Sequence, residues 1–425
     1  CLKLSYKDTA QQNSYVTIPR ATNSFDNTEI VANVDEDIID SLTGGRLVGS
    51  VTSFENFAEC PLRYYLRYGV DLKEREEFTF SPVNFGVVLH AVIREVCDEI
   101  KKNGESYYLI SEEKRREMVK RSVAAITDIY QNSILKDSSR NSFMIKRMED
   151  LADRTIWAMG EQLKCGDFVP FVFEHKFNME VGDGDRKQLM SGTIDRVDIC
   201  ENGTDVYVRI IDYKTGKKDF NIVKTYYGID IQLMVYMEAA MKLVAKMRPG
   251  KNVIPAGVFY YNISDPIVSA TTESAEEIED KIKGELRLKG MVNSDKDIAE
   301  KMDNTEGTSL NIPVSRKADG GFDSRRSKVM NTEQFNMLGR FVDVRAVDTA
   351  DRIAGGDIRR SPYKDGQFSS CDRCPYGAVC GFSVDLPGCN YRKLKKFDDE
   401  VLWNNIKEGV DENGKKMDTG AEECD

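Results

Sequence analysis

The 425-residue sequence contains only two histidines, and it has no long hydrophobic run. With His90 and His175 alone, a metal site built from several histidines is excluded. No stretch of about 18 apolar residues exists, so we expect no transmembrane helix and no membrane association. The sequence begins at Cys1 without an initiator methionine or an apolar signal region, which predicts a piece of a longer, cytoplasmic protein.

Glycine-rich phosphate loops of the P-loop or dinucleotide type are also absent from the sequence. The formal net charge is −11, but this does not exclude nucleic acid, because phosphate binding needs only a local basic groove. Ten cysteines are too few for a disulfide scaffold of this length. Three of them lie close together, at Cys371, Cys374 and Cys380, and this clustering favours a metal site over disulfides.

Composition divides the chain into three parts. Residues 1–47 are polar and acidic and are predicted to be a linker or the remnant of an upstream region. Residues 48–395 are predicted to form one domain, with a helical insertion at about 105–165. Residues 396–425 are predicted to be a charged, loose tail.

Local patterns predict an α/β protein. Thr52-Ser53-Phe54-Glu55 matches a capping box, which predicts a helix over about 52–67 with a kink at Cys60-Pro61. Further helices are expected at 84–101, 229–246 and 332–354, with an acidic helix within 270–330. Strands are expected at 171–179, 189–200, 205–212 and 255–262.

Asn202-Gly203 lies between two strand-like runs and predicts a two-residue hairpin turn. The predicted register pairs Glu201 with Thr204, Ile199 with Val206, Val197 with Val208, and Asp195 with Ile210. One face of this ribbon then carries Val197, Ile199, Val206, Val208 and Ile210. At its far end the same face carries Asp195, Asp212 and Lys214, with the two carboxylates as diagonal neighbours within reach of one cation.

Two acids and a lysine at the end of an apolar face fit phosphodiester hydrolysis. Carboxylates hold hard cations such as Mg²⁺, which polarise a phosphoryl group and activate water. Lys214 would orient the water or offset developing negative charge. The alternative is an ordinary salt bridge between Asp212 and Lys214 at the edge of the sheet.

Two helical features extend this constellation. Gln232 and Tyr236 are spaced i,i+4 and share one helix face, which points either toward the site or into an ordinary amphipathic interface. His90 follows Phe85-Gly86-Val87-Val88-Leu89, so it is either a buried core histidine or a ligand.

Taken together, these residues resemble the RecB-type family of PD-(D/E)XK nucleases. The motifs that carry the resemblance are Gly86-x-x-x-His90, Gly192-x-Ile194-Asp195-Arg196-x-Asp198, Ile210 to Gly216 with Asp212-Tyr213-Lys214-Thr215-Gly216, and Gln232-x-x-x-Tyr236. The resemblance implies a restriction-endonuclease-like mixed sheet flanked by helices. It also implies that His90, Asp195, Asp212 and the carbonyl of Tyr213 bind Mg²⁺, or Mn²⁺ in its place. Lys214 would be the catalytic lysine, Gln232 and Tyr236 would line the site, and Glu174 would match a family glutamate.

Over about residues 48–395, the chain also resembles the C-terminal nuclease domains of the AddB family of helicase–nuclease subunits. The additional segments are Ser53-Phe54-Glu55, Cys60-Pro61, Leu72-Lys73-Glu74-Arg75, Ala256 to Tyr261, Cys371 to Tyr376, and Cys380-Gly381-Phe382. This resemblance implies a Mg²⁺-dependent DNA exonuclease that processes double-strand ends for recombinational repair, acting on the 5′-ended strand. It further implies an AddA-type helicase–nuclease partner, and residues 1–47 as a remnant of a helicase-like region.

The clustered cysteines need a fourth ligand to form a closed site, and Cys60 is the best candidate, with Cys389 as a competitor. Four thiolates suit either a [4Fe–4S] cluster or a structural zinc ion. One remote cysteine with three clustered ones is unlike the paired Cys-x-x-Cys knuckles of zinc ribbons. Together with the family pattern, in which one cysteine precedes the nuclease core and three follow it, this favours a [4Fe–4S] cluster that joins the two ends of the domain.

Other functions are compatible with parts of this pattern. A CRISPR-adaptation nuclease shares the core and the cysteines but lacks the long insertions. A non-catalytic DNA-binding or scaffolding module with the same fold would not need Asp195, Asp212 and Lys214 intact. A zinc-stabilised structural protein would be colourless.

Overall fold

The computed structural model describes residues 33–35, 48–73, 82–129, 139–181, 188–268, 273–386 and 389–419. The predicted linker at 1–47 lies outside these residues, apart from 33–35. In the described ranges, no helix has both the length and the apolar character needed to cross a bilayer.

A mixed sheet forms the centre of the molecule, and a small second sheet lies near the C-terminus. The central strands are β1 (Val48–Ser50), β2 (Val169–Val181), β3 (Gln188–Asn202), β4 (Asp205–Lys214), β5 (Asn252–Asn262), β6 (Lys289–Asn293) and β7 (Val329–Met330). The small sheet contains β8 (Tyr363–Asp365), β9 (Phe368–Ser369) and β10 (Arg392–Lys393).

The helices flank both faces of the central sheet. Those before β3 are α2 (Val51–Glu59), α3 (Pro61–Tyr64), the π-helix η1 (Tyr65–Gly69), α4 (Pro82–Lys102), α5 (Glu112–Ile129) and α6 (Ser139–Lys164). Those after β4 are α7 (Ile222–Tyr226), α8 (Gln232–Met247), α9 (Ala275–Glu285), α10 (Lys296–Met302), α11 (Thr332–Ala354), α12 (Gly377–Cys380) and α13 (Asp399–Thr419).

Strand β3 is the longest of the central strands and organises the sheet. It pairs antiparallel with β2 along one edge, while β1 and β4 share its other edge, β1 in parallel and β4 antiparallel. The order then continues through β5, parallel to β4, to β6 and β7. Helices α7 and α8 form the crossover between β4 and β5, as a parallel pair requires.

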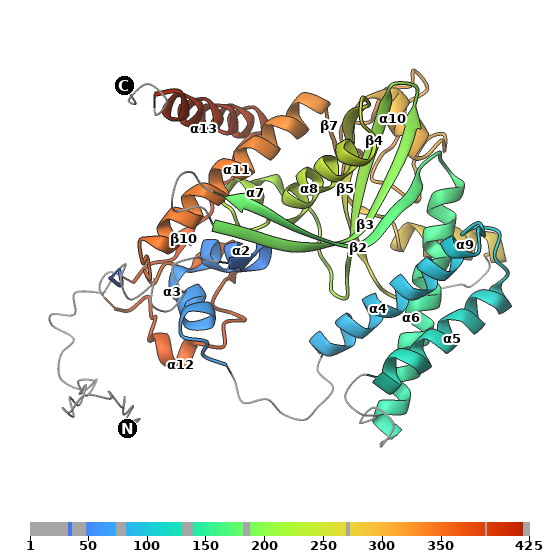
Figure 1. The fold of residues 1–425 in the computed structure, drawn as a ribbon, viewed down its shortest axis with the longest axis horizontal. Coiled ribbons are helices and arrows are strands. Elements are labelled where there is room, and N and C mark those ends of the chain that lie inside the picture. The colour runs from blue at the N-terminus through green and yellow to red at the C-terminus, as the bar shows by residue number, and fades with distance from the viewer. Residues whose placement is uncertain are drawn as a thin grey trace.

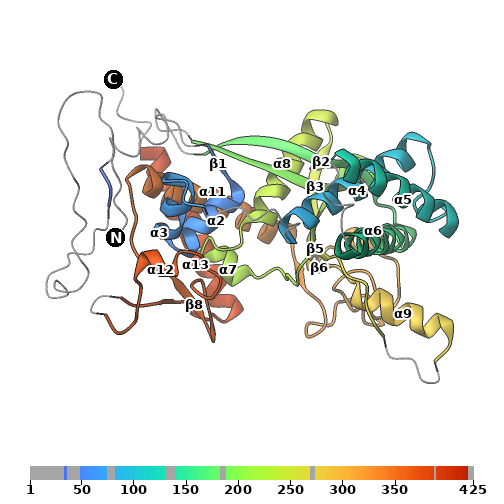
Figure 2. The ribbon, with the colours of Figure 1, turned by 90° about the horizontal axis from the view of Figure 1, so that it is seen from below.

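Helices cover both faces of this sheet (Figures 1 and 2). A hydrophobic core lies between the sheet and the helices on each face. One core packs α4, α5 and α6 against side chains such as Tyr207, Ile211 and Tyr213 of β4. The other packs α8 and α11 against Val206, Val208 and Ile210 of the same strand. Alternate residues of β4 therefore serve opposite cores, as the period of two in a strand requires.

The predicted hairpin between β3 and β4 is present, but its register is shifted by two residues. Asn202 pairs with Asp205 and Val197 with Ile210, so Gly203 and Thr204 form the turn instead of Asn202 and Gly203. The side-chain amide of Asn202 donates to Tyr207 Oη at 3.2 Å and to Asp297 Oδ2 at 3.1 Å. These contacts hold Asn202 in the ladder and leave Gly203, at φ 60°, to make the turn.

A shift of two residues leaves every side chain on its predicted face. Val197, Ile199, Val206, Val208 and Ile210 all belong to one core, as expected from the sequence. Continuing the ladder by one pair beyond Arg196 and Ile211 puts Asp195 opposite Asp212. The predicted pairing of Asp195 with Ile210 was therefore wrong, because Ile210 pairs with Val197 and the ladder ends at Arg196 and Ile211.

The predictions for the first helix and for the C-terminal tail also need correction. The helix at 52–67 breaks at Cys60 as predicted, but Ser50 caps it, since the N–H of Ser53 donates to Ser50 Oγ at 3.1 Å. The prediction of a loose tail at 396–425 was wrong for the described part, because α13 occupies Asp399–Thr419. Its Leu402 and Ile406 are buried in the core that contains α11, and this burial stabilises the helix despite its charged sequence.

Candidate active site

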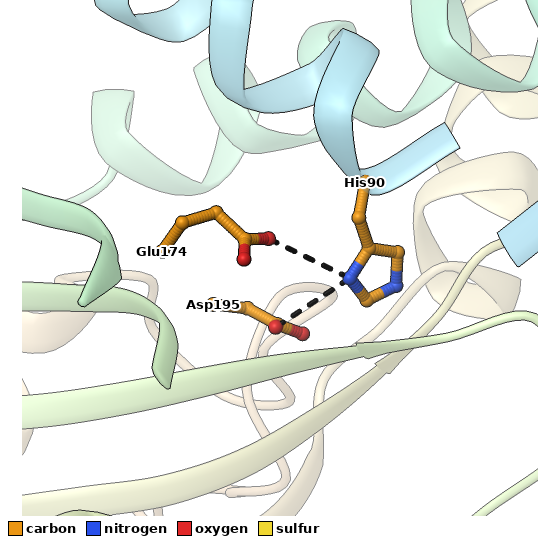
Figure 3. A group of neighbouring side chains, drawn as sticks. All are labelled: His90, Glu174 and Asp195. Atoms are coloured by element: carbon orange, nitrogen blue, oxygen red, sulfur yellow. Dashed lines mark ion pairs between the residues drawn. The ribbon is translucent and has the colours of Figure 1, made fainter. Parts of the chain in front are cut away.

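Three side chains from three elements converge at the edge of the α4 core (Figure 3). His90 comes from α4, Glu174 from β2 and Asp195 from β3, and their ligand atoms all lie within 4.8 Å of one another. Nδ1 of His90 is 3.5 Å from Asp195 Oδ1 and 3.7 Å from Glu174 Oε1. An imidazole and two carboxylates at this spacing can hold a divalent cation.

The charges around His90 oppose the effect of its burial. Burial alone would lower the pKa of His90, but hydrogen bonds and the negative charges of Asp195 and Glu174 raise it to about 10. The imidazole therefore carries a proton at neutral pH in the metal-free site. A cation that takes its place among the carboxylates has to displace that proton.

Glu174 is the member of the group that the sequence identified least securely. It lies between Phe173, which pairs with Arg196, and His175, which pairs with Ile194, so it is opposite Asp195. Its backbone adopts φ 47°, a conformation that residues with a side chain rarely adopt within a strand. Strained backbone of this kind concentrates at functional sites. The signal in the sequence was weak because no short turn fixes the register of β2 against β3.

Asp212 and Lys214 lie beside this group on β4. Asp212 is only 2% exposed, and Lys214 Nζ is 2.5 Å from its Oδ2. Burial and the charge of Asp195 together raise the pKa of Asp212 to about 7, although the charge of Lys214 opposes both. Asp212 is not a member of the 4.8 Å group in the described chain, but it interacts with that group through Asp195.

The backbone of Tyr213 connects the two strands at the site. Its N–H donates to Asp195 Oδ2 at 2.7 Å and so fixes the orientation of that carboxylate. Its ring is buried in the α4 core and meets the ring of His90 edge-on, with centroids 5.9 Å apart. Tyr213 therefore contacts two of the three grouped residues.

Helix α8 supplies the two remaining predicted residues. Lys214 Nζ donates to Gln232 Oε1 at 3.0 Å, and Gln232 Nε2 donates to Tyr236 Oη at 2.9 Å. The predicted i,i+4 face of α8 thus points toward the lysine, and the chain of hydrogen bonds orients its ammonium group. All the predicted catalytic and metal-binding residues meet at one end of the β3–β4 ribbon.

Asp198, three residues beyond Asp195, has a different environment. Arg196 Nη2 is 2.6 Å and Arg209 Nε is 2.9 Å from its Oδ2, and all three side chains are essentially inaccessible to solvent. The guanidinium of Arg209 also lies 4.8 Å from the ring of Phe168. This group is an internal ion cluster behind the site, in which one carboxylate is paired with two guanidinium groups.

The four predicted cysteine ligands line one small cavity. Cys60 follows α2, Cys371 and Cys374 precede α12, and Cys380 ends it. Cys389 is buried and is not among the residues that line this cavity. The structure therefore brings Cys60, and not Cys389, together with the three clustered cysteines.

The surroundings of these thiols contain donors that oppose part of the effect of burial. Burial raises the pKa of Cys60, while the backbone N–H groups of Arg63 and Ser361 oppose that rise. The N–H of Phe382 donates to Cys380 Sγ at 3.4 Å. Arg63 and Arg360 also line the cavity. Backbone donors and guanidinium groups stabilise thiolates, which are the metal-binding form of cysteine.

Comparison with known proteins agrees with this arrangement. The sequence profile of the PD-(D/E)XK nuclease superfamily matches residues 49–381. A protein of Lachnoclostridium phytofermentans that is named as a subunit of an ATP-dependent helicase/deoxyribonuclease is 34% identical over 399 residues, covering 91% of this chain and 34% of the relative. A protein of the same name from Thermoanaerobacter sp. is 33% identical, and the match covers 87% of this chain and 33% of that relative. Another, from Clostridium acetobutylicum, is 34% identical, and the match covers 91% of this chain and 34% of that relative. The chain thus spans about a third of the length of these relatives. With the profile match covering most of its length, the chain belongs to the PD-(D/E)XK nuclease superfamily.

Proposed function

We propose that this chain is the nuclease domain of a helicase–nuclease and that it hydrolyses phosphodiester bonds of DNA with a divalent cation. The observation that carries the proposal is the convergence of His90, Glu174 and Asp195 beside the Asp212–Lys214 pair. Three carboxylates face one lysine here, so the site has excess negative charge in the absence of a cation. Such a site is stable at neutral pH only when protons or a metal offset that charge.

His90, Glu174, Asp195 and Asp212 would hold Mg²⁺, or Mn²⁺ in its place, with the carbonyl of Tyr213 as a further ligand. Their oxygen-rich donor set, with one imidazole, fits either ion. When bound, the metal supplies Lewis acidity for the phosphoryl group and an activated water.

The residues of the chain have separate tasks in this mechanism. The N–H of Tyr213 holds the carboxylate of Asp195 in a fixed orientation. Lys214 presents a positive charge, oriented by Gln232, toward the position where a phosphate would accumulate negative charge during attack. Tyr236 fixes the amide of Gln232 through its hydroxyl group.

We further propose that Cys60, Cys371, Cys374 and Cys380 hold a [4Fe–4S] cluster. Sulfur atoms around a tetrahedral zinc ion lie roughly 3.8 Å apart, given zinc–sulfur bonds of about 2.3 Å. In the described parts of the chain, no three of these thiols lie within 4.8 Å of one another, which supports a larger group. The cluster would join the first and last segments of the domain, and its role would be structural.

The natural setting of the domain follows from its relatives and from its resemblance to AddB proteins. The relatives are named as subunits of an ATP-dependent helicase/deoxyribonuclease. We infer an AddA-type helicase–nuclease protein as partner, double-strand DNA ends as substrate, and the 5′-ended strand as the one degraded. The process would be recombinational repair in the cytoplasm.

The test is cleavage of linear DNA with and without Mg²⁺ by the wild type and by Lys214→Ala. We expect metal-dependent cleavage by the wild type and a loss of about 100- to 1,000-fold in the variant, since a charge that stabilises the transition state is removed. Lys242→Ala is the matched control. Lys242 is an exposed lysine on α8 whose side chain pairs with Glu238, and its removal leaves cleavage unchanged.

Two outcomes would contradict the proposal. A wild type that binds DNA but never cleaves it would identify a non-catalytic module with a nuclease fold. A colourless protein that contains zinc and no iron after anaerobic preparation would refute the cluster, which should absorb broadly near about 400 nm.

A further inference from the structure

Glu55 makes a contact that its sequence pattern did not predict. The capping-box pattern assigned its carboxylate to the start of its own helix, but Ser50 performs that task. Glu55 instead reaches the start of α8, where its Oε1 accepts the N–H groups of Ile231 and Gln232, each at 3.0 Å. A side chain of α2 therefore caps a helix that begins more than 170 residues later in the sequence.

Helix α8 has no cap of its own. Its N-cap residue is Ile231, which has no side chain that can accept a hydrogen bond. The first N–H groups of a helix lack partners within the helix, and negative charge is favourable there because of the helix dipole. Glu55 therefore supplies both the acceptor and the charge that the local sequence lacks.

The capped residue is the one that orients the catalytic lysine. Glu55 fixes the backbone of Gln232, and the side chain of Gln232 accepts from Lys214 Nζ at 3.0 Å. Thus only one residue separates the carboxylate of Glu55 from the ammonium group of Lys214. Displacement of the first turn of α8 would move the amide that orients that ammonium group.

The end of helix α2 and the start of α3 are, in turn, held against the cysteine-bearing segment. The N–H of Leu62 donates to the carbonyl of Arg359 at 3.3 Å, and Ser370 Oγ donates to the carbonyl of Glu59 at 3.4 Å. These contacts fix the position from which Glu55 reaches α8. The position of Glu55 therefore depends on the packing around the cysteine cavity.

The carboxylate of Glu55 lies in a charged environment of its own. Lys218 Nζ is 3.0 Å from Asp230 Oδ1, which also accepts from the hydroxyl group of Tyr260 at 2.6 Å. Burial raises the pKa of Glu55 to about 7, and the charge of Lys218 opposes this. The hydrogen bonds from α8 and the nearby lysine together compensate for the burial of the carboxylate.

We propose that Glu55 is a positioning residue for Lys214, acting through the N-terminus of α8 and the side chain of Gln232. The inference rests on the proposed nuclease function for its effect on rate, but the hydrogen bonds to α8 can be tested without that function. A misplaced catalytic group costs up to about 100-fold in rate, so we expect Glu55→Ala to lower kcat by roughly 10- to 100-fold. KM for DNA should change little, because Glu55 is not proposed to contact the substrate.

Two further substitutions distinguish the effect of side-chain length from the effect of charge at Glu55. Glu55→Gln keeps the length of the side chain and a carbonyl acceptor, so it should retain most of the wild-type kcat. Glu55→Asp keeps the charge but is one methylene shorter, so it should resemble Glu55→Ala. Thr52→Ala is the matched control, because Thr52 is the exposed residue that the capping-box pattern paired with Glu55. If that pattern held, Thr52→Ala and Glu55→Ala would have similar effects.

The experiment combines kcat and KM for cleavage with amide hydrogen exchange at Ile231 and Gln232, in preparations matched for iron content and Tm. Faster exchange and lower kcat in Glu55→Ala and Glu55→Asp, with near wild-type values in Glu55→Gln and Thr52→Ala, support the proposal. Unchanged exchange at both amides in Glu55→Ala overturns it, as does unchanged kcat in an active enzyme. If the wild type does not cleave DNA at all, the proposed function fails, and the exchange data still decide whether Glu55 holds α8.

Discussion

Asp195 and Asp198 are separated by two residues on β3, yet their surroundings differ in almost every respect. Asp198 is held between two arginines in a cluster that excludes solvent. Asp195 faces His90 and Glu174, with Asp212 beside it and Lys214 as the nearest lysine of the site. The protein thus pairs the charges of one acid fully and leaves the other in a site with excess negative charge. A cluster with excess negative charge on a rigid strand indicates a place for an external cation, while a carboxylate held by two buried guanidinium groups indicates a structural role.

The largest expected effect is on DNA cleavage, which should depend on Asp195. Asp195→Asn should lower metal-dependent DNA cleavage by about 100- to 1,000-fold, because a candidate ligand loses its charge. The free energy of unfolding should change little, because the weaker repulsion from Asp212 and Glu174 offsets the lost attraction to the protonated His90. Cleavage assays and denaturant unfolding on the same preparation test both statements. Substantial unfolding of this variant would place Asp195 in the structural class with Asp198.

The next largest effect is the loss of protein stability when Asp198 is replaced. Asp198→Asn should lower the free energy of unfolding by about 3–5 kcal/mol, because it leaves Arg196 and Arg209 buried without a counter-charge. Denaturant unfolding measures the change, with Asp195→Asn as the matched control from the same strand. A stable Asp198→Asn protein would show that the internal ion cluster contributes little to folding.

A third prediction concerns pH and metal affinity. The raised pKa values of His90, about 10, and Asp212, about 7, mean that protons occupy the metal-free site at neutral pH. A cation must displace them, so its apparent affinity should increase with pH, by about tenfold per pH unit for each proton displaced. The increase should be steeper below pH 7 than above it. Calorimetric titration with Mn²⁺ between about pH 6 and 8 tests this, and Asp212→Asn should remove the change of slope.

The smallest effect concerns the turn that aligns both acids with β4. Gly203 has φ 60°, and no atom lies within 4 Å of a Cβ built there. Gly203→Ala should therefore lower the free energy of unfolding by only about 1 kcal/mol, through backbone strain alone. Thermal unfolding measures this loss, and cleavage should be unaffected. A much larger loss would mean that the register of the ribbon depends on this one residue.

The faces of the β3–β4 ribbon were predictable from the sequence, but its register was not. Alternation of apolar residues fixed which side chains share a core, and it is unchanged by a shift of two positions. The turn moved because Asn202 hydrogen bonds to Tyr207 and Asp297, and Asp297 belongs to α10, far along the chain. Contacts of this kind cannot be read from a local pattern.

The candidate site and the C-terminal helix also combine features that a local pattern predicts with features that depend on distant contacts. Asp195, Asp212 and Lys214 follow from strand periodicity, whereas the place of Glu174 depends on a backbone conformation in β2 that its sequence does not signal. Glu55 matched a capping pattern but contacts a distant helix instead. Helix α13 was missed because its charged sequence is stabilised by packing against a core that forms from other parts of the chain.

The cavity formed by Cys60 and the three later cysteines has a consequence for how the protein matures. Cys60 precedes most of the domain in the sequence, so the other three cysteines are synthesised only after nearly all of the residues between them. The proposed cluster could be bound by all four sulfurs only in a chain whose intervening segments have already folded. Binding of the cluster would then depend on completed folding. Chains that do not finish folding would remain without a cluster.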